Sequence, residues 1–257
     1  MSVNPLSPVP SHSTAMEISN LIRQALARTP ARLLAGRSGP GYRTSTWLQL
    51  LADHAAARDA VYAELDFERD FGLDLIQAHG LFCVQSLAQS KTDYLMRPDL
   101  GRKLSEDATD EIRRRCTREA DIQVIIGDGL SATAVARQVP QLLAHLKAHI
   151  DARGWRFGVP FAVRYCRVGI LNDVGDLLQP VVAVLLIGER PGLATDESLS
   201  AYMSYQPHSG HTDANRNLIS NIHARGVSID EGAKRIAALA EKMMKHRNSG
   251  VLIKEET

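Results

Sequence analysis

Hydrophobic and polar positions change their period along the chain, from a helical spacing in the first half to alternating strand and helix segments after about residue 120. Near the start, apolar side chains recur with the three- and four-residue spacing of a helix stripe, at Ile18, Leu21, Ile22, Ala25 and Leu26. Thr14 and Glu17 form the capping-box pattern that precedes a helix. We expect this helix to dock on its own protein, with recruitment to a larger assembly as the alternative.

The segments around this helix divide the first 120 residues into two parts. Residues 1–14 are rich in Pro and Ser and are typical of a mobile arm, so the arm and the helix form a segment over residues 1–30. Residues 31–120 have a mainly helical pattern, which is strongest at residues 46–61. The Gly-rich stretch at residues 36–41 lacks the Gly-Lys-Ser/Thr ending of a phosphate-binding loop, and we interpret it as a loop, with a role in an interface as the open alternative.

Residues 121–257 alternate between strand and helix patterns. A β-branched run at residues 122–126 is followed by a helix that begins near Ser131 and that Pro140 should kink or restart. Residues 161–168 alternate like a strand, residues 175–178 suggest a short helix, and the continuously apolar residues 181–187 predict a central strand. The sequence therefore predicts an α/β protein, with a helical N-terminal part and a Rossmann-like, mainly parallel α/β domain.

Two loops at predicted strand ends are candidates for a ligand site. Residues 127–129 (Gly-Asp-Gly) follow the first strand and residues 188–192 (Gly-Glu-Arg-Pro-Gly) follow the apolar one. Ligands of open parallel sheets bind beyond the carboxyl ends of the strands, glycines permit close approach, and the carboxylates of Asp128 and Glu189 can accept hydrogen bonds. A ligand rich in amide and ribose groups would suit both loops, although Gly-Asp-Gly is also a common turn and Glu189 with Arg190 can form a plain surface ion pair.

Composition narrows the function classes. A net charge of +1 and only 5% aromatic residues argue against a nucleic-acid partner. No apolar run approaches membrane-spanning length and the polar start does not resemble a signal peptide, so we expect a soluble, cytoplasmic protein without a membrane partner. Cys83, Cys116 and Cys166 are widely spaced, which predicts free thiols and no metal site of the protein's own.

A nucleotide-binding oxidoreductase that acts alone stays open as an alternative. Gly127 and Gly129 begin a dinucleotide-binding pattern, but Ala132 stands at the third glycine position. Asp151 has the spacing of a ribose-binding acid, yet it falls within or after the helix and not on a second strand.

Several segments together carry a resemblance to a known family. Their order along the chain is residues 36–61, 97–102, 128–132, 186–193, Ser198-Leu199, Tyr202 and 212–222. From about residue 30 to its end, the chain resembles the light chain, or small subunit, of ethanolamine ammonia-lyase. The runs GERPGL and SNI are the most specific parts of the match.

The resemblance implies an adenosylcobalamin-dependent ammonia-lyase, a carbon–nitrogen lyase that converts ethanolamine to acetaldehyde and ammonia. It implies a hetero-oligomer in which a large subunit carries the substrate site on a TIM barrel, and a location in a bacterial microcompartment. The family's cobalamin contacts correspond to Val168, Glu189 and the position of Leu218, which is commonly Cys in the family. Asp128 is added from the strand-end argument alone, and we expect no catalytic residue on this chain.

One absent motif bears on how the cofactor would bind. The Asp-x-His-x-x-Gly pattern, which supplies a histidine to cobalt, does not occur in the sequence, and His79-Gly80 lacks its preceding residues. We therefore expect cobalamin to keep its own dimethylbenzimidazole on cobalt, in the base-on form.

Overall fold

The computed structural model describes residues 20–25, 36–192 and 195–254. The chain divides into two compact units, residues 1–53 and 54–257. In the first unit, residues 20–25 are helical, whereas Thr14, Glu17, Ile18, Leu26 and the predicted arm lie outside the described residues.

The Gly-rich stretch of the first unit forms a hairpin. Strand β1 (Arg37–Ser38) pairs antiparallel with β2 (Gly41–Tyr42), and the turn between them uses a positive φ of 60° at Gly39. Helix α2 (Thr44–Tyr62) follows, which confirms the helix predicted at residues 46–61. The segment expected to be a loop is therefore a short β-hairpin. The sequence did not predict it because strands of two residues are too short to show an alternating pattern.

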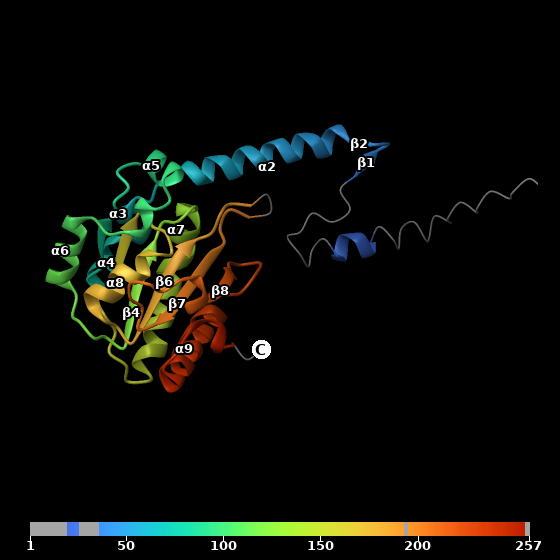
Figure 1. The fold of residues 1–257 in the computed structure, drawn as a ribbon. Coiled ribbons are helices and arrows are strands. Elements are labelled where there is room, and N and C mark those ends of the chain that lie inside the picture. Colours follow the sequence, from blue (N-terminus) through green and yellow to red (C-terminus); the bar gives the residue numbers. More distant parts are fainter. Residues whose placement is uncertain (1–19, 26–35, 193–194, 255–257) are drawn as a thin grey trace, which may run out of the picture. The chain divides into compact units, whose positions relative to one another are not determined.

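The second unit is built around a six-stranded sheet in the order β3-β5-β4-β6-β7-β8 (Figure 1). The strands are β3 (Phe82–Gln85), β4 (Ile122–Gly127), β5 (Phe161–Arg164), β6 (Val182–Gly188), β7 (Leu199–Tyr205) and β8 (Asn217–Ile222). The first four strands in the sheet order are parallel, and β7 and β8 complete the sheet as antiparallel neighbours. The mainly parallel α/β architecture is confirmed, with the difference that edge strand β3 comes from the region predicted to be mainly helical.

Helices cover both faces of this sheet (Figure 1). The helices are α3 (Phe67–Phe71), α4 (Leu73–His79), α5 (Lys91–Met96), α6 (Glu106–Arg115), α7 (Ala132–Asp151), α8 (Ile170–Leu178) and α9 (Ile229–His246). Val124 packs in the core under α7 and α9, whereas its neighbour Ile125 packs in the core under α6 and α8. Because successive side chains of a strand point to opposite faces, a strand covered on both sides must be apolar throughout. Every residue of β6 is buried, as expected of a central strand.

Helix α7 runs through Pro140 without a restart. The helix begins after Ser131, whose hydroxyl accepts a hydrogen bond from the amide of Ala134 at 3.0 Å. On either side of the proline, Val139 and Leu142 are completely buried in the core. Of the two expected effects of Pro140, a kink or a restart, the restart does not occur. One proline removes one backbone hydrogen bond, and we attribute the continuity to burial of the apolar stripe along the helix.

No helix in the described ranges combines the length and apolarity that crossing a bilayer requires. Cys83, Cys116 and Cys166 are free, as predicted, and burial raises the pKa of the Cys116 thiol to about 12.

Candidate functional site

A cavity of about 420 Å³ opens at the carboxyl end of β6 and contains three of the four predicted site residues. Val168 comes from the loop between β5 and α8, Glu189 from the residue after β6, and Leu218 from β8. Leu218 stands opposite Tyr202 in the register of β7 and β8, and its side chain is 46% exposed. The fold thus brings together positions that are far apart in the sequence.

Glu189 is held in a fixed position by donors from two neighbouring strands. Its carboxylate accepts hydrogen bonds from the hydroxyl of Ser198 at 2.9 Å, the hydroxyl of Ser200 at 2.5 Å and the backbone amide of Asn221 at 3.1 Å. A carboxylate offers about four lone-pair directions, so roughly one acceptor position is left for a ligand. The half-buried carboxylate is therefore an oriented acceptor for an amide or hydroxyl group.

Asp128 has a different position from the one the sequence suggested. Its side chain does not line the cavity but is buried, with 3% exposure. Its two oxygens accept hydrogen bonds from the backbone amides of Tyr165 at 2.8 Å and Cys166 at 2.9 Å. Burial raises the pKa of Asp128, and these amide hydrogen bonds oppose the rise. Asp128 holds the start of the loop that carries Val168, and its carboxylate is not free to bind a ligand directly.

The two Gly-containing loops contact each other closely where they line the cavity. The amide of Leu130 donates a 3.1 Å hydrogen bond to the carbonyl of Gly188. A Cβ at Gly129, whose φ is +58°, would lie 2.3 Å from that same carbonyl oxygen. Glycine is therefore required at position 129 by both conformation and space.

Several cavity residues were not identified from the sequence, and Arg167 is the most informative of them. Its guanidinium carbon lies 4.2 Å from the ring centroid of Tyr94, and its Nη2 donates to the Tyr94 carbonyl at 3.2 Å. Tyr94 belongs to the short helix α5, far from the strand ends in sequence. The position of Arg167 directly before Val168 was the only sequence signal for it.

The surroundings of Ser131 argue against the dinucleotide-binding alternative. In dinucleotide-binding folds the pyrophosphate lies at the N-terminus of the helix after the first strand. Here the Ser131 hydroxyl donates to the carbonyl of Asp196, and Gln138 donates to the carbonyl of Glu197 at 3.2 Å. The segment before β7 therefore covers the start of α7, where a pyrophosphate would have to bind.

A further cavity, of about 550 Å³, lies at the other end of β6, between residues that include Glu119, Arg156 and Val181. It does not include any of the predicted site residues. In parallel sheets ligands bind at the carboxyl ends of the strands, which favours the cavity around Glu189.

Comparisons with known proteins identify the family of this chain. The sequence profile of the family described as ethanolamine ammonia-lyase light chain (EutC) matches residues 19–254. The chain is 41% identical over 225 residues to the ethanolamine ammonia-lyase small subunit of Clostridium acetobutylicum, covering 88% of this chain and 90% of that protein. It is 40% identical over 223 residues to the small subunit of Fusobacterium nucleatum, with 87% and 74% covered. For the small subunit of Clostridioides difficile the identity is 39% over 228 residues, with 89% and 76% covered. The chain therefore belongs to the ethanolamine ammonia-lyase small-subunit, or light-chain, family.

Proposed function

We propose that this chain binds adenosylcobalamin in the cavity lined by Val168, Glu189 and Leu218, as the small subunit of an ethanolamine ammonia-lyase. One observation carries the proposal. The three positions that the family resemblance implies come from a loop, a strand end and an edge strand, and they line the same cavity. Convergence of such distant positions is typical of a shared binding surface.

The residues present fit an amide-rich cofactor with apolar surfaces. Glu189 presents an oriented acceptor for an amide or ribose hydroxyl, and Val168 and Leu218 offer apolar contacts beside it. No described residue forms a hydrogen bond with the Tyr202 hydroxyl, which can therefore donate to a ligand. When bound, adenosylcobalamin supplies radical chemistry by homolysis of its cobalt–carbon bond, and this chain orients the cofactor and excludes water.

The size of the cavity supports a shared site. Pockets that enclose drug-sized ligands have volumes of about 300–1,000 Å³, and adenosylcobalamin is considerably larger than such ligands. A cavity of about 420 Å³ can contact one part of that cofactor only. We therefore assign the rest of the cofactor surface, the substrate site and the catalytic residues to a large subunit, in a hetero-oligomer that converts ethanolamine to acetaldehyde and ammonia.

The test begins with co-purification of this chain with the large subunit, followed by an adenosylcobalamin-dependent assay of ammonia release from ethanolamine. Equilibrium dialysis of the reconstituted complex then measures cofactor affinity. Glu189→Gln should weaken binding by about 10-fold or more, the effect of losing one hydrogen bond to a charged group. Unchanged affinity would show that Glu189 does not contact the cofactor.

Two controls separate ligand contact from structural damage. Ser200→Ala removes one donor to Glu189 without changing the carboxylate, so it should lower affinity less than Glu189→Gln does. Glu241→Gln changes an exposed acid on α9 that pairs with Arg153, and it should leave affinity unchanged. Turnover of alcohols with NAD by this chain alone would instead support the oxidoreductase alternative.

We propose that residues 1–30 serve recruitment to a bacterial microcompartment and not catalysis, which is the alternative to the expected docking of this helix on its own protein. The predicted apolar stripe, of which Leu21 is 64% exposed, supports this assignment. Deletion of residues 1–30 should abolish encapsulation and leave ammonia release by the reconstituted complex unchanged. Loss of turnover in that variant would contradict the assignment.

A further inference from the structure

A third cavity, of about 510 Å³, adjoins the cavity around Glu189 and shares Arg167, Val168 and Tyr202 with it. We call it the Arg216 cavity, after the arginine that follows the short helix η2 (Asp213–Asn215). The three shared residues, two from the loop between β5 and α8 and one from β7, make the two cavities neighbours. A ligand bound in the cavity around Glu189 would therefore lie beside the Arg216 cavity.

Buried nitrogen atoms without partners cluster at the Arg216 cavity. The atoms are Nε of Arg167, Nε of Arg216 and Nδ1 of His211, and all three residues line the cavity. The side chain of Arg216 is only 6% exposed, and its terminal nitrogens donate to Asn172 at 2.9 Å and to Asp213 at 2.5 Å. A buried charged donor without an acceptor is costly, so the two arginine nitrogens point to an acceptor that the described residues do not provide. Burial lowers the pKa of His211, so its Nδ1 is not counted as a charged donor.

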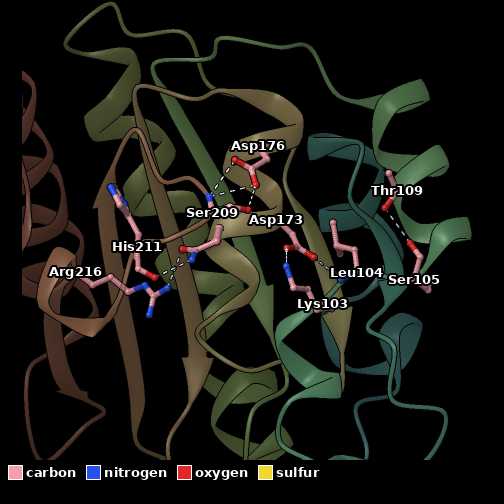
Figure 2. Close-up of polar contacts among 10 residues, drawn as sticks. Lys103, Leu104, Ser105, Thr109, Asp173, Asp176, Ser209, His211 and Arg216 are labelled. Atoms are coloured by element: carbon pink, nitrogen blue, oxygen red, sulfur yellow. Dashed lines mark hydrogen bonds and ion pairs between the residues drawn. The ribbon is translucent and has the colours of Figure 1, made fainter.

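The cavity has a surplus of positive charge. Its lining includes Arg102, Lys103, Arg167 and Arg216 but only one carboxylate, that of Asp213. Asp173, which does not line the cavity, pairs with Lys103 at 2.6 Å; Figure 2 shows this pair together with Arg216 and His211. Among the described residues no carboxylate forms an ion pair with Arg102 or Arg167, although Asp99, which pairs with Arg97, also interacts electrostatically with Arg102.

Two features suit an anion with several oxygens, such as a phosphate. Arginine presents several donors in a planar fork that matches phosphate and carboxylate oxygens. Gly169, which immediately precedes α8, also lines the cavity, so the positive end of that helix dipole lies at its edge. Asp173 in the first turn of α8 is already engaged by Lys103 and by the amide of Leu104, and does not occupy the arginine nitrogens.

We propose that the Arg216 cavity binds a phosphodiester anion, with Arg216 and Arg167 as its principal donors. The inference rests on the proposed function, because a cofactor in the adjoining cavity would have to bring the anion. Adenosylcobalamin carries one phosphodiester, in the nucleotide loop that links its corrin to dimethylbenzimidazole. The Arg216 cavity is then the subsite for that loop, and the cavity around Glu189 receives uncharged parts of the cofactor.

The test compares two cofactor forms on the complex reconstituted with the large subunit. Adenosylcobinamide lacks the nucleotide and its phosphodiester, so the difference between the two affinities isolates this subsite. By equilibrium dialysis, Arg216→Gln should weaken adenosylcobalamin binding by about 10- to 100-fold, as expected for one charge-assisted hydrogen bond. Binding of adenosylcobinamide should change by less than about threefold.

Two further variants distinguish the loss of a ligand contact from a disturbance of the fold. Arg216 also bonds to Asn172, so its replacement can disturb the fold. Arg102→Gln removes a cavity charge whose side chain makes no hydrogen bond or ion pair with another described residue, and it should weaken adenosylcobalamin binding by a few-fold in a salt-dependent way. Arg113→Gln, on the exposed face of α6, is the matched control and should change neither affinity.

Equal weakening of both cofactor forms, or of neither, overturns the inference. So does a loss of subunit association at unchanged cofactor affinity, which would assign the arginines to a carboxylate of the large subunit. If Glu189→Gln weakens adenosylcobalamin binding while Arg216→Gln and Arg102→Gln do not, the proposed function stands and only the phosphodiester subsite fails. If none of the three variants affects binding, both fail.

Discussion

The Asp128 carboxylate accepts a 2.8 Å hydrogen bond from the backbone amide of Tyr165, which joins the end of β4 to the end of β5. Tyr165 has a positive φ of 56°, a conformation that costs a residue with a side chain roughly 1–2 kcal/mol. The neighbouring amide of Cys166 donates to the other carboxylate oxygen at 2.9 Å. Asp128 thus stabilises the backbone turn that leads directly to Arg167 and Val168.

Replacement of Asp128 by Asn should lower the free energy of unfolding by about 2–3 kcal/mol, because one buried amide loses its acceptor. Denaturant unfolding monitored by circular dichroism measures this change. Asp110→Asn, on the exposed face of α6, is the matched control and should shift stability by no more than about 0.5 kcal/mol. Equal midpoints for the wild-type protein and Asp128→Asn would contradict the structural role of Asp128.

The Asp128 carboxyl group also makes the free energy of unfolding depend on pH. Burial raises the pKa of Asp128 in the folded state above its ordinary value of 3.8. Between 3.8 and the raised pKa, the folded state holds a proton that the unfolded state has lost, so the contribution of this group to stability falls as pH rises. The stability advantage of the wild-type protein over Asp128→Asn should therefore narrow as pH increases from 3.8. Unfolding measured at a series of pH values tests this, and a widening gap would refute it.

Gly129→Ala should destabilise the protein by about 3 kcal/mol or more, since it combines an unfavourable φ with a steric clash. The clash is with the carbonyl oxygen of Gly188, which would lie 2.3 Å from the methyl carbon of the new alanine. Gly154→Ala is the control: its φ of +67° is similar, but no atom lies within 4 Å of its Cβ position. That variant should cost only about 1 kcal/mol. Similar losses for both variants would show that conformation alone, and not loop contact, governs position 129.

Leu218→Cys introduces the residue that the family resemblance associates with this position. Because Leu218 is 46% exposed, stability should change by less than about 1 kcal/mol. If the cofactor contact is apolar, affinity in the reconstituted complex should stay within about threefold, while Leu218→Ala should weaken it by a few-fold through lost apolar area. Equilibrium dialysis measures the cofactor affinity of both variants. A tenfold gain for Leu218→Cys would reveal a role specific to sulfur.

The sequence by itself determined the central architecture and the candidate site positions. The continuous apolar run of β6 predicted a strand covered on both faces, because every side chain of such a strand is buried. The apolar spacing that follows residue 131 predicted the start of α7 near Ser131, whose hydroxyl caps the helix in the structure. The family resemblance singled out Val168, Glu189 and Leu218, which the fold brings to one cavity.

Only the tertiary structure decided what several of these residues contact. Asp128 faces two buried amides and not the cavity, and Arg167 and Arg216 line one cavity from separate loops. Strand β3 joins the sheet although its four residues show too short a pattern to identify. Local patterns report burial and backbone preference, whereas the partner of a buried polar group is set by contacts between distant segments. That is why the sequence could point to Val168, Glu189 and Leu218, which line one cavity, but could not assign Asp128 its structural role.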